Sequence, residues 1–313
     1  MPQMTPAQAR AADPVLTTHA RGYRNAQLVA DRLFPFADVA AYGGRVIEFG
    51  KDEFKLYGSK RAPGSNVKRV TIGYGSSPYS IVPSALNAVV PSELMRDAAA
   101  VPGINLATNA VNKALRSLLL EYESDAAAIA TTAANYDSAH KVTLSGTDVW
   151  SDAASDPVGD VEAGKEAIRA SIGIYPNTLL LSAKAASKLR AHQKIVDRTA
   201  NTGIRRVTLD LLAQIFEVQN VVVAGSVVAN DADVLADVWG TAAVLAYVSE
   251  GAAVNADITE PSYGYGYRIE GMPLVRAPYW DQDTLSWLYG VSNDCTPVLA
   301  GMAAGYLITG AGL

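Results

Sequence analysis

The clearest pattern in the chain is a helical one in its first half. From residue 105 to residue 134, apolar side chains recur at spacings of three and four, as one face of an α-helix requires. They are Val111, Leu115, Leu118, Tyr122, Ala126 and Ile129. The pattern predicts one helix over 105–134, and at 1.5 Å per residue this helix would be roughly 45 Å long. Such a helix is long for a compact enzyme.

A pattern typical of β-strands precedes this helix. The runs RVIEFGKDEFKLY (45–57) and VTIGYG (70–75) are rich in β-branched and aromatic residues, and the residues between them include glycine and proline, which favour a turn. The sequence therefore predicts a long hairpin that projects from the body of the protein. Because a two-stranded ribbon is only marginally stable alone in water, we expect it to lie on another molecule.

The second half of the chain alternates between short helical and short strand patterns. Helices are expected over 161–172, 183–192 and 207–218, the last with Thr208 as its N-cap. Strands are expected over 177–182, 220–225, 241–248 and 263–269. The segment 195–206 is basic and is expected to be a mobile connector. This order predicts a mixed α+β module.

The C-terminal residues 296–313 carry no charge and are about as long as a membrane-spanning helix. Glycines and Pro297 dilute their hydrophobicity, however, and no Lys or Arg flanks the run. We therefore expect two short buried strands, TPVLAG (296–301) and GYLIT (305–309). A membrane-tethered protein remains an alternative.

Composition narrows the possible classes of protein. With 313 residues, of which 49% are hydrophobic, the chain can bury one large core or two. Its net charge of −5 argues against a dedicated nucleic-acid binder, because such binding needs clustered Lys and Arg. The single cysteine, Cys295, excludes an intramolecular disulfide. The first residues do not form a signal peptide, so we expect the protein to fold in a cytoplasm.

Charge is distributed unevenly along the chain. The tip of the predicted hairpin is basic, whereas the end of the long helix and the following segment are acidic. The basic residues that we single out are Lys60, Arg61, Lys68 and Arg69, and the acidic ones are Glu121, Glu123 and Asp125. The acids either form a solvated surface or bind the basic tip of another copy of the chain. The second reading makes these seven residues candidate contacts between copies.

Recognisable catalytic motifs are scarce. The three histidines lie far apart in sequence, without zinc-site spacing, and we expect them on the surface. Gly73 and Gly75 lack the third glycine of a dinucleotide loop, and no base lies near Cys295 in the sequence. The alternating Tyr263, Tyr265 and Tyr267 favour packing. The sequence predicts no catalytic, cofactor-binding or metal-binding residue and no enzyme activity.

One ordered set of segments resembles a known family. The runs NTLLLSAKAASKLRAHQKIVDR, VTLDLLAQIFEVQNVVVAGSVV, DVWGTAAVLAYV and PSYGYGYRIEG, over about 177–271, are similar in type and order to the second half of tailed-bacteriophage major capsid proteins. The resemblance implies the α+β Hong Kong 97-type capsid fold. It implies an N-terminal arm (1–45), an extended loop (46–82), a peripheral domain (83–154 and 251–313) that includes a spine helix (105–134), and an axial domain (155–250).

The same resemblance implies a function in the virion. Copies of the chain would assemble in the host cytoplasm into hexamers and pentamers of an icosahedral head that encloses double-stranded DNA without reading its sequence. It also implies a separate scaffolding protein, a portal and possibly a decoration protein as partners, no cofactor and no membrane. Some relatives form Lys–Asn crosslinks, but beside Lys60 no asparagine partner is recognisable.

Two further interpretations stay open on the sequence alone. An encapsulin-type nanocompartment would have the same fold and an enzyme cargo in place of DNA. An α/β or α+β enzyme without a recognisable motif is the other interpretation, and the mixed module of the second half is its best support.

Overall fold

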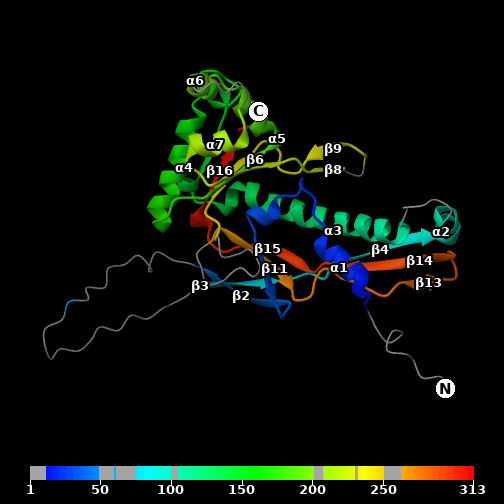
Figure 1. Ribbon diagram of the computed structural model, residues 1–313. Coiled ribbons are helices and arrows are strands. Elements are labelled where there is room, and N and C mark those ends of the chain that lie inside the picture. Colours follow the sequence, from blue (N-terminus) through cyan, green and yellow to red (C-terminus); the bar gives the residue numbers. More distant parts are fainter. Residues whose placement is uncertain are drawn as a thin grey trace.

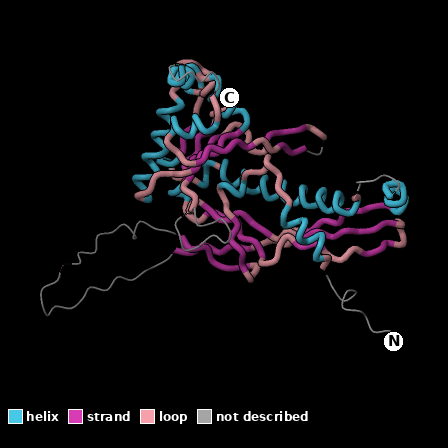
Figure 2. Tube along the Cα trace, in the orientation of Figure 1, coloured by secondary structure: helices cyan, strands magenta, loops and turns pink. Residues whose placement is uncertain are grey.

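The computed structural model describes residues 12–48, 60, 75–99, 105–200, 207–229, 232–249 and 262–313. Figure 1 shows a long helix, α3, running through the molecule, with a helix-rich part at one end of it and β-sheets along its lower side. Figure 2 shows the same division by secondary structure. The mixed helix and sheet content confirms the α+β class.

Several helices are capped by the side chain of the residue that precedes them. Asn105 accepts a hydrogen bond from the Thr108 N–H at the start of α3, and Asp13 and Ser182 cap α1 and α5 in the same way. The helices are α1 (Pro14–Gly22), α2 (Ser92–Ala99), α3 (Leu106–Thr131), α4 (Pro157–Ile172), α5 (Ala183–Ala191), α6 (Gln193–Ala200) and α7 (Leu209–Phe216). Short 3-10 turns cover Ala30–Arg32, Ala133–Asn135, Ser138–His140, Gly146–Asp148 and Met302–Ala304.

The strands come from all parts of the chain. In the first half they are β1 (Phe36–Val39), β2 (Gly43–Glu48), β3 (Gly75–Ser80), β4 (Ala85–Pro91) and β5 (Lys141–Thr143). In the second half they are β6 (Thr178–Ser182), β7 (Asn220–Ala224), β8 (Val227–Ala229), β9 (Leu235–Asp237), β10 (Ala243–Ala246), β11 (Gly264–Ile269), β12 (Leu274–Val275), β13 (Tyr279–Asp281), β14 (Ser286–Ser292), β15 (Cys295–Leu299) and β16 (Gly305–Thr309).

The predicted long helix is confirmed as α3, which has 26 residues and is about 39 Å long. Its apolar stripe contacts two different cores. Val111, Leu115 and Leu118 pack against the sheet formed by β4, β12, β13 and β14, whereas Tyr122 and Ala126 pack in the central core. The helix therefore ties two parts of the molecule together.

A five-stranded sheet, in the order β5-β16-β10-β6-β7, forms the centre of the helix-rich part. The strands β6 and β10 are buried along their whole length, and α4, α5 and α7 pack on this part of the chain. The sheet includes β5 and β16, which come from outside the predicted axial domain (155–250). The predicted boundaries therefore do not coincide with the sheet, because strands distant in sequence complete it.

The N-terminal segment is built into the body of the protein from α1 onward, where Ala20 is buried against α3 and β12. Leu33 and Phe34 have no exposed side-chain surface, and β1 pairs in parallel with β11 in a three-stranded sheet with β15. The predicted N-terminal arm (1–45) is therefore not separate from the body in this stretch, because its apolar residues are part of the central core. Residues 1–11 lie outside the described residues.

Two other expectations have clear outcomes. The C-terminal run forms the strands β15 and β16, as predicted, and no helix within the described ranges is long and apolar enough to span a membrane. The expected connector over 195–206 is wrong in its first half, because residues 193–200 form the helix α6 and Ile195 is fully buried. Residues 201–206 lie outside the described residues.

Candidate functional site

The histidines form no common site. His140 and His192 are each only 4% exposed, so the expectation of surface positions is wrong for both. His140 lies between the Gly305 carbonyl, 2.9 Å from Nδ1, and the Ser171 hydroxyl, 2.8 Å from Nε2. A buried imidazole with both nitrogens hydrogen-bonded serves packing, and the sequence carried no periodic signal for it.

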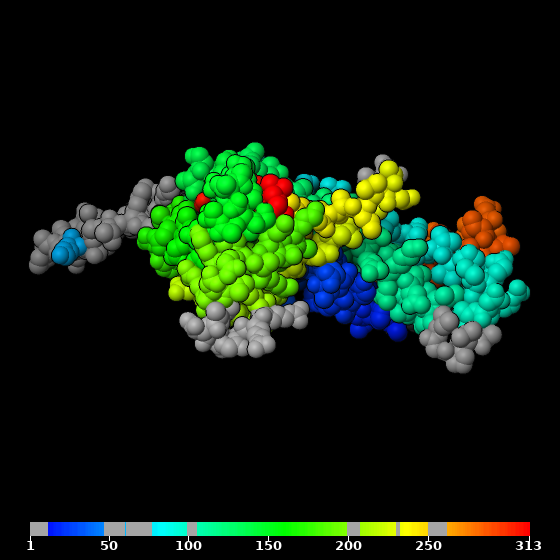
Figure 3. Space-filling model, turned by 90° about the horizontal axis from the view of Figure 1, so that it is seen from above, coloured from blue at the N-terminus to red at the C-terminus, as the bar shows by residue number. Residues whose placement is uncertain are grey.

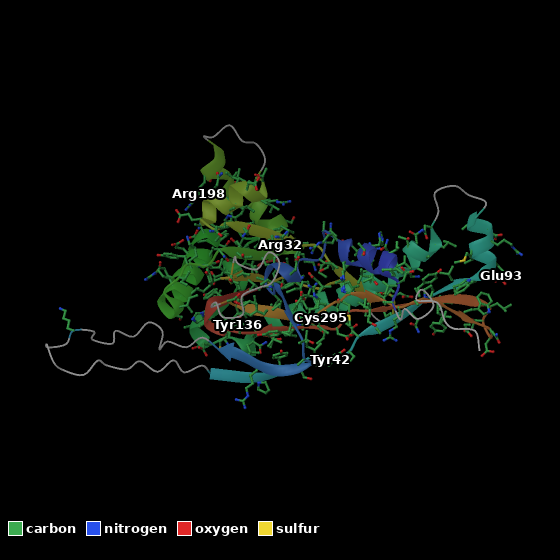
Figure 4. All side chains as sticks on the ribbon, turned by 60° about the horizontal axis from the view of Figure 1, so that its bottom comes forward. Arg32, Tyr42, Glu93, Tyr136, Arg198 and Cys295 are labelled. Atoms are coloured by element: carbon green, nitrogen blue, oxygen red, sulfur yellow. The ribbon has the colours of Figure 1, made fainter. Side chains whose placement is uncertain are left out.

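Cys295 is an inert thiol. Burial raises its pKa to about 12, and the Asn293 side-chain amide donates to its sulfur at 3.3 Å. A thiol with such a pKa is not a nucleophile at neutral pH. Figure 4 places Cys295 within the body of the molecule, whereas Arg198 and Glu93 lie toward two separate extremities. Across the part of the chain that is described, no three His, Cys, Asp or Glu side chains could share a metal ion.

The structure describes the root of the predicted hairpin, where its two strands leave the body of the protein. The strands β2 and β3 pair antiparallel, from Gly43 opposite Ser80 to Glu48 opposite Gly75. Lys60 is exposed, and Arg61, Lys68 and Arg69 lie outside the described residues, as does most of the predicted strand over 70–75. Figure 1 shows β2 and β3 extending side by side from the sheets below α3.

The root of this ribbon is firmly held. Val46 and Ile81 are buried against β11, and Tyr79 stacks on Tyr267 with 4.3 Å between the ring centroids. The buried Asp294 accepts hydrogen bonds from both chain segments that flank the root, namely from Tyr42 Oη at 2.8 Å and from Ser84 N at 2.9 Å. The hydrogen bond to Asp294 also raises the pKa of Tyr42. The direction of the ribbon is therefore set by its own subunit.

The three candidate acids of α3 do not share one environment. Glu121 and Asp125 are exposed, lie four residues apart and therefore share one face of the helix. Neither forms an ion pair with any residue that the structure describes. Like charges at this spacing destabilise a helix slightly, so an external cation would be favourable there.

Glu123 is the exception, and its assignment as a contact between copies is wrong. Its side chain is 1% exposed, and its oxygens accept hydrogen bonds from the N–H groups of Val29 (3.0 Å) and Ala30 (2.8 Å), from Trp239 Nε1 (2.7 Å) and from Ser226 Oγ (3.4 Å). Burial raises the pKa of this carboxyl, and these hydrogen bonds oppose the rise. The sequence predicted Glu123 on the surface because this residue is charged. Helical periodicity, in contrast, places it next to the buried Tyr122.

An apolar row on the four-stranded sheet escaped the sequence interpretation. Tyr279, Leu288 and Val89 lie side by side across β13, β14 and β4, and Tyr279 and Val89 are each more than half exposed. The adjacent Tyr289 and Val90 pack on α3, so this row faces away from the helix. Strand register decides which residues share a face, and no single run of sequence shows register.

Comparisons with known proteins agree on one family. A family model described as phage major capsid protein E matches residues 122–291. The major capsid protein of Burkholderia phage BcepMu is 36% identical over 302 residues, covering 96% of this chain and 97% of that protein.

Solved structures resemble the whole chain as well. A phage-related protein from Bordetella bronchiseptica RB50 is 52% identical, with a TM-score of 0.84, and the match covers 98% of this chain and 99% of that one. An encapsulin complex from Synechococcus elongatus PCC 7942 is 14% identical, with a TM-score of 0.54, over 93% of this chain and 89% of that one. At that identity the encapsulin shares only the fold.

Proposed function

This chain belongs to the family of phage major capsid proteins and has the Hong Kong 97-type capsid fold, and we propose that its copies join as hexamers and pentamers. The family places the protein in the virion, where capsid subunits assemble into a shell with one another. The proposed shell is an icosahedral head that forms in the host cytoplasm and encloses double-stranded DNA. The protein acts through contacts between copies, without an active site.

The β2–β3 ribbon is the observation that carries this proposal. It is two-stranded, and its described strands are anchored at their root, by the apolar cluster around Val46 and by Asp294. A ribbon of two strands gains little stability in water. Contact with a neighbouring subunit buries the surface that a ribbon of two strands leaves exposed to water. The exposed apolar row of Tyr279, Leu288 and Val89 gains in the same way when another copy covers it.

Charge suggests where the ribbon of one subunit lies on the next. In this proposal the basic tip residues Lys60, Arg61, Lys68 and Arg69 lie near Glu121 and Asp125 of a neighbour, whereas Glu123 takes no part. Contacts between different surfaces of identical copies are heterologous, and they close into rings when the rotation allows it. Hexamers and pentamers are such rings.

Partners other than the chain itself are also proposals. A separate scaffolding protein would guide assembly, a portal would occupy one vertex, and a decoration protein could cover the outer surface. The net charge of −5 favours weak, non-specific contact with packaged DNA, since like charge discourages binding to phosphate.

Electron microscopy of the purified chain, expressed alone and together with the scaffolding protein of the same phage, tests the proposal. We expect uniform closed shells of on the order of tens of nanometres, as rings of heterologous contacts produce. A protein that stays a monomer or dimer under both conditions would contradict it. Shells from infected cells that contain protein cargo and no DNA would favour the encapsulin interpretation instead.

Charge reversal tests the contact between ribbon and helix. The variant in which Lys60, Arg61, Lys68 and Arg69 are all replaced by Glu should stay folded and lose shell assembly, and adding E121K and D125K should restore it. The matched control adds E93K and D97K, two exposed acids with the same spacing on α2, which should not restore assembly. Normal assembly of the first variant would refute this contact.

A further inference from the structure

Three segments that are distant in sequence meet at the Glu123 carboxylate. The first is α3, which carries it. The second is the N-terminal segment, through the backbone N–H groups of Val29 and Ala30. The third is the base of the β8–β9 hairpin, where Ser226 and Trp239 donate hydrogen bonds to the carboxylate. One side chain therefore connects elements that share no strand pairing with one another in the described structure.

Glu123 helps to set the direction of the hairpin, together with the ion pair between Lys184 and Asp237 of β9 at 3.0 Å. Ser226 directly precedes β8 and Trp239 follows β9, and the Val238 N–H donates to the Ser226 carbonyl at 3.1 Å, which closes the base. The hairpin has three residues in each strand and extends from the five-stranded sheet over α3 in Figure 1 and Figure 3. Val227 and Leu235 on its strands are exposed, so its described strands offer little packing of their own.

The N-terminal segment depends on it as well. Ala30 begins a 3-10 turn over Ala30–Arg32, and no side chain at its own N-cap, Val29, satisfies the first N–H groups. Unpaired N–H groups at the start of a helical turn need an acceptor when they are buried. Glu123 supplies that acceptor from another element. Leu33 and Phe34 then follow directly into the central core.

The chemistry of the site requires a carboxylate. All of its hydrogen-bond partners are donors, and a carboxylate is acceptor-only at both oxygens, whereas an amide of the same shape has one acceptor and one donor group. No cation offsets the buried charge among the residues described. Asp31 adds a repulsive charge, and Arg21, Arg24 and Arg268 line the adjacent cavity without forming an ion pair to Glu123.

We propose that the Glu123 carboxylate is a joint of the subunit. Its hydrogen bonds fix Val29, Ala30 and the root of the β8–β9 hairpin to α3. Val29, Ala30 and Trp239 also pack in the central core, whereas the two other large clusters contain none of these three residues.

Hydrogen exchange measured by NMR or by mass spectrometry on the unassembled full-length subunit tests the joint. Glu123→Gln keeps the shape of the side chain but turns an N–H₂ group toward donors. We expect the exchange rates of the Val29, Ala30 and Val238 amides to rise about tenfold or more, since hydrogen bonds to charged groups are the stronger ones. The amides of β6 and β10 should keep their protection. The matched control is Glu121→Gln, two residues earlier on the same helix and exposed, which should change none of these rates.

Two outcomes would overturn the proposal. Unchanged exchange in Glu123→Gln would show that the carboxylate holds neither segment, and an equal rise throughout the chain would show a general loss of stability. If this variant fails to fold, Trp239→Phe removes the indole donor, together with part of a buried ring. It should raise exchange at Val238 while Val29 and Ala30 stay protected, and unchanged exchange at Val238 would equally refute the joint.

Discussion

Replacing Gly266 by alanine should destabilise the subunit through one identifiable collision. In the run YGYGY, Tyr265 and Tyr267 pack in the cluster with Val46 and Ile81, and Gly264 and Gly266 leave room on the opposite side of the strand. A Cβ atom at Gly266 would overlap the Tyr122 hydroxyl and would lie 3.0 Å from the Phe34 carbonyl oxygen. That hydroxyl donates to the same carbonyl at 3.2 Å.

The magnitude follows from three contributions. Forcing an extra methyl group into a packed core costs about 1–3 kcal/mol. Breaking the buried hydrogen bond from Tyr122 to Phe34 costs about 0.5–1.5 kcal/mol. Alanine in place of glycine restricts the unfolded chain, which returns about 0.4–1 kcal/mol. We therefore expect G266A to lower the free energy of unfolding by roughly 0.5–4 kcal/mol.

Urea unfolding of the unassembled subunit, followed by fluorescence and circular dichroism, measures this difference. G22A is the matched control, because a Cβ at Gly22 meets no atom within 4 Å, and its effect should stay within about 1 kcal/mol. Y122F removes the obstructing hydroxyl, so G266A should cost less in a Y122F background than in the wild type. An unchanged stability in G266A, or a cost that Y122F leaves unaltered, would refute the reasoning.

Three further predictions concern single residues. T208A should lower the free energy of unfolding by about 1 kcal/mol, because the Thr208 hydroxyl accepts a hydrogen bond from the Leu211 N–H at the start of α7. T208S keeps the hydroxyl and should retain most of this stability in the same urea titration. Burial raises the pKa of Tyr267 to about 12, so the unfolded state releases this proton first, and stability should fall as the pH rises from about 10 through about 12; Y267F should show a shallower fall. Cys295 should react with a thiol reagent at pH 8 at least about a hundredfold more slowly in the folded than in the unfolded chain, as its raised pKa requires, and equal rates would contradict its burial.

Elements whose signal is local could be predicted well. The apolar stripe from Val111 to Ala126 identified α3 to within a few residues, and the Thr208 hydroxyl caps α7 as expected. The strands β6, β7, β10, β11, β15 and β16 also appear where apolar runs predicted them, whereas β8, β9, β12, β13 and β14 were not predicted. Each of these signals lies within a dozen or so neighbouring residues, where periodicity and capping act directly.

Charge was a poor guide to position for Glu123. The sequence grouped it with Glu121 and Asp125, although residues two apart on a helix point in different directions. Its burial follows from donors at Val29, Trp239 and Ser226, which approach from three other places in the chain. Without those donors a buried carboxylate would be strongly unfavourable, and sequence spacing does not reveal them.

The sequence by itself determined the α+β class, the long helix, part of the strands in the second half and, through an ordered resemblance, the capsid family. Only the tertiary structure decided that β5 and β16 complete the five-stranded sheet, that His140 and His192 are buried, and that Glu123 joins three segments inside the subunit. The physical reason is the distance along the sequence over which each interaction acts. Helix periodicity and capping depend on near neighbours, whereas strand register and the burial of a polar group depend on partners that folding brings from distant parts of the chain.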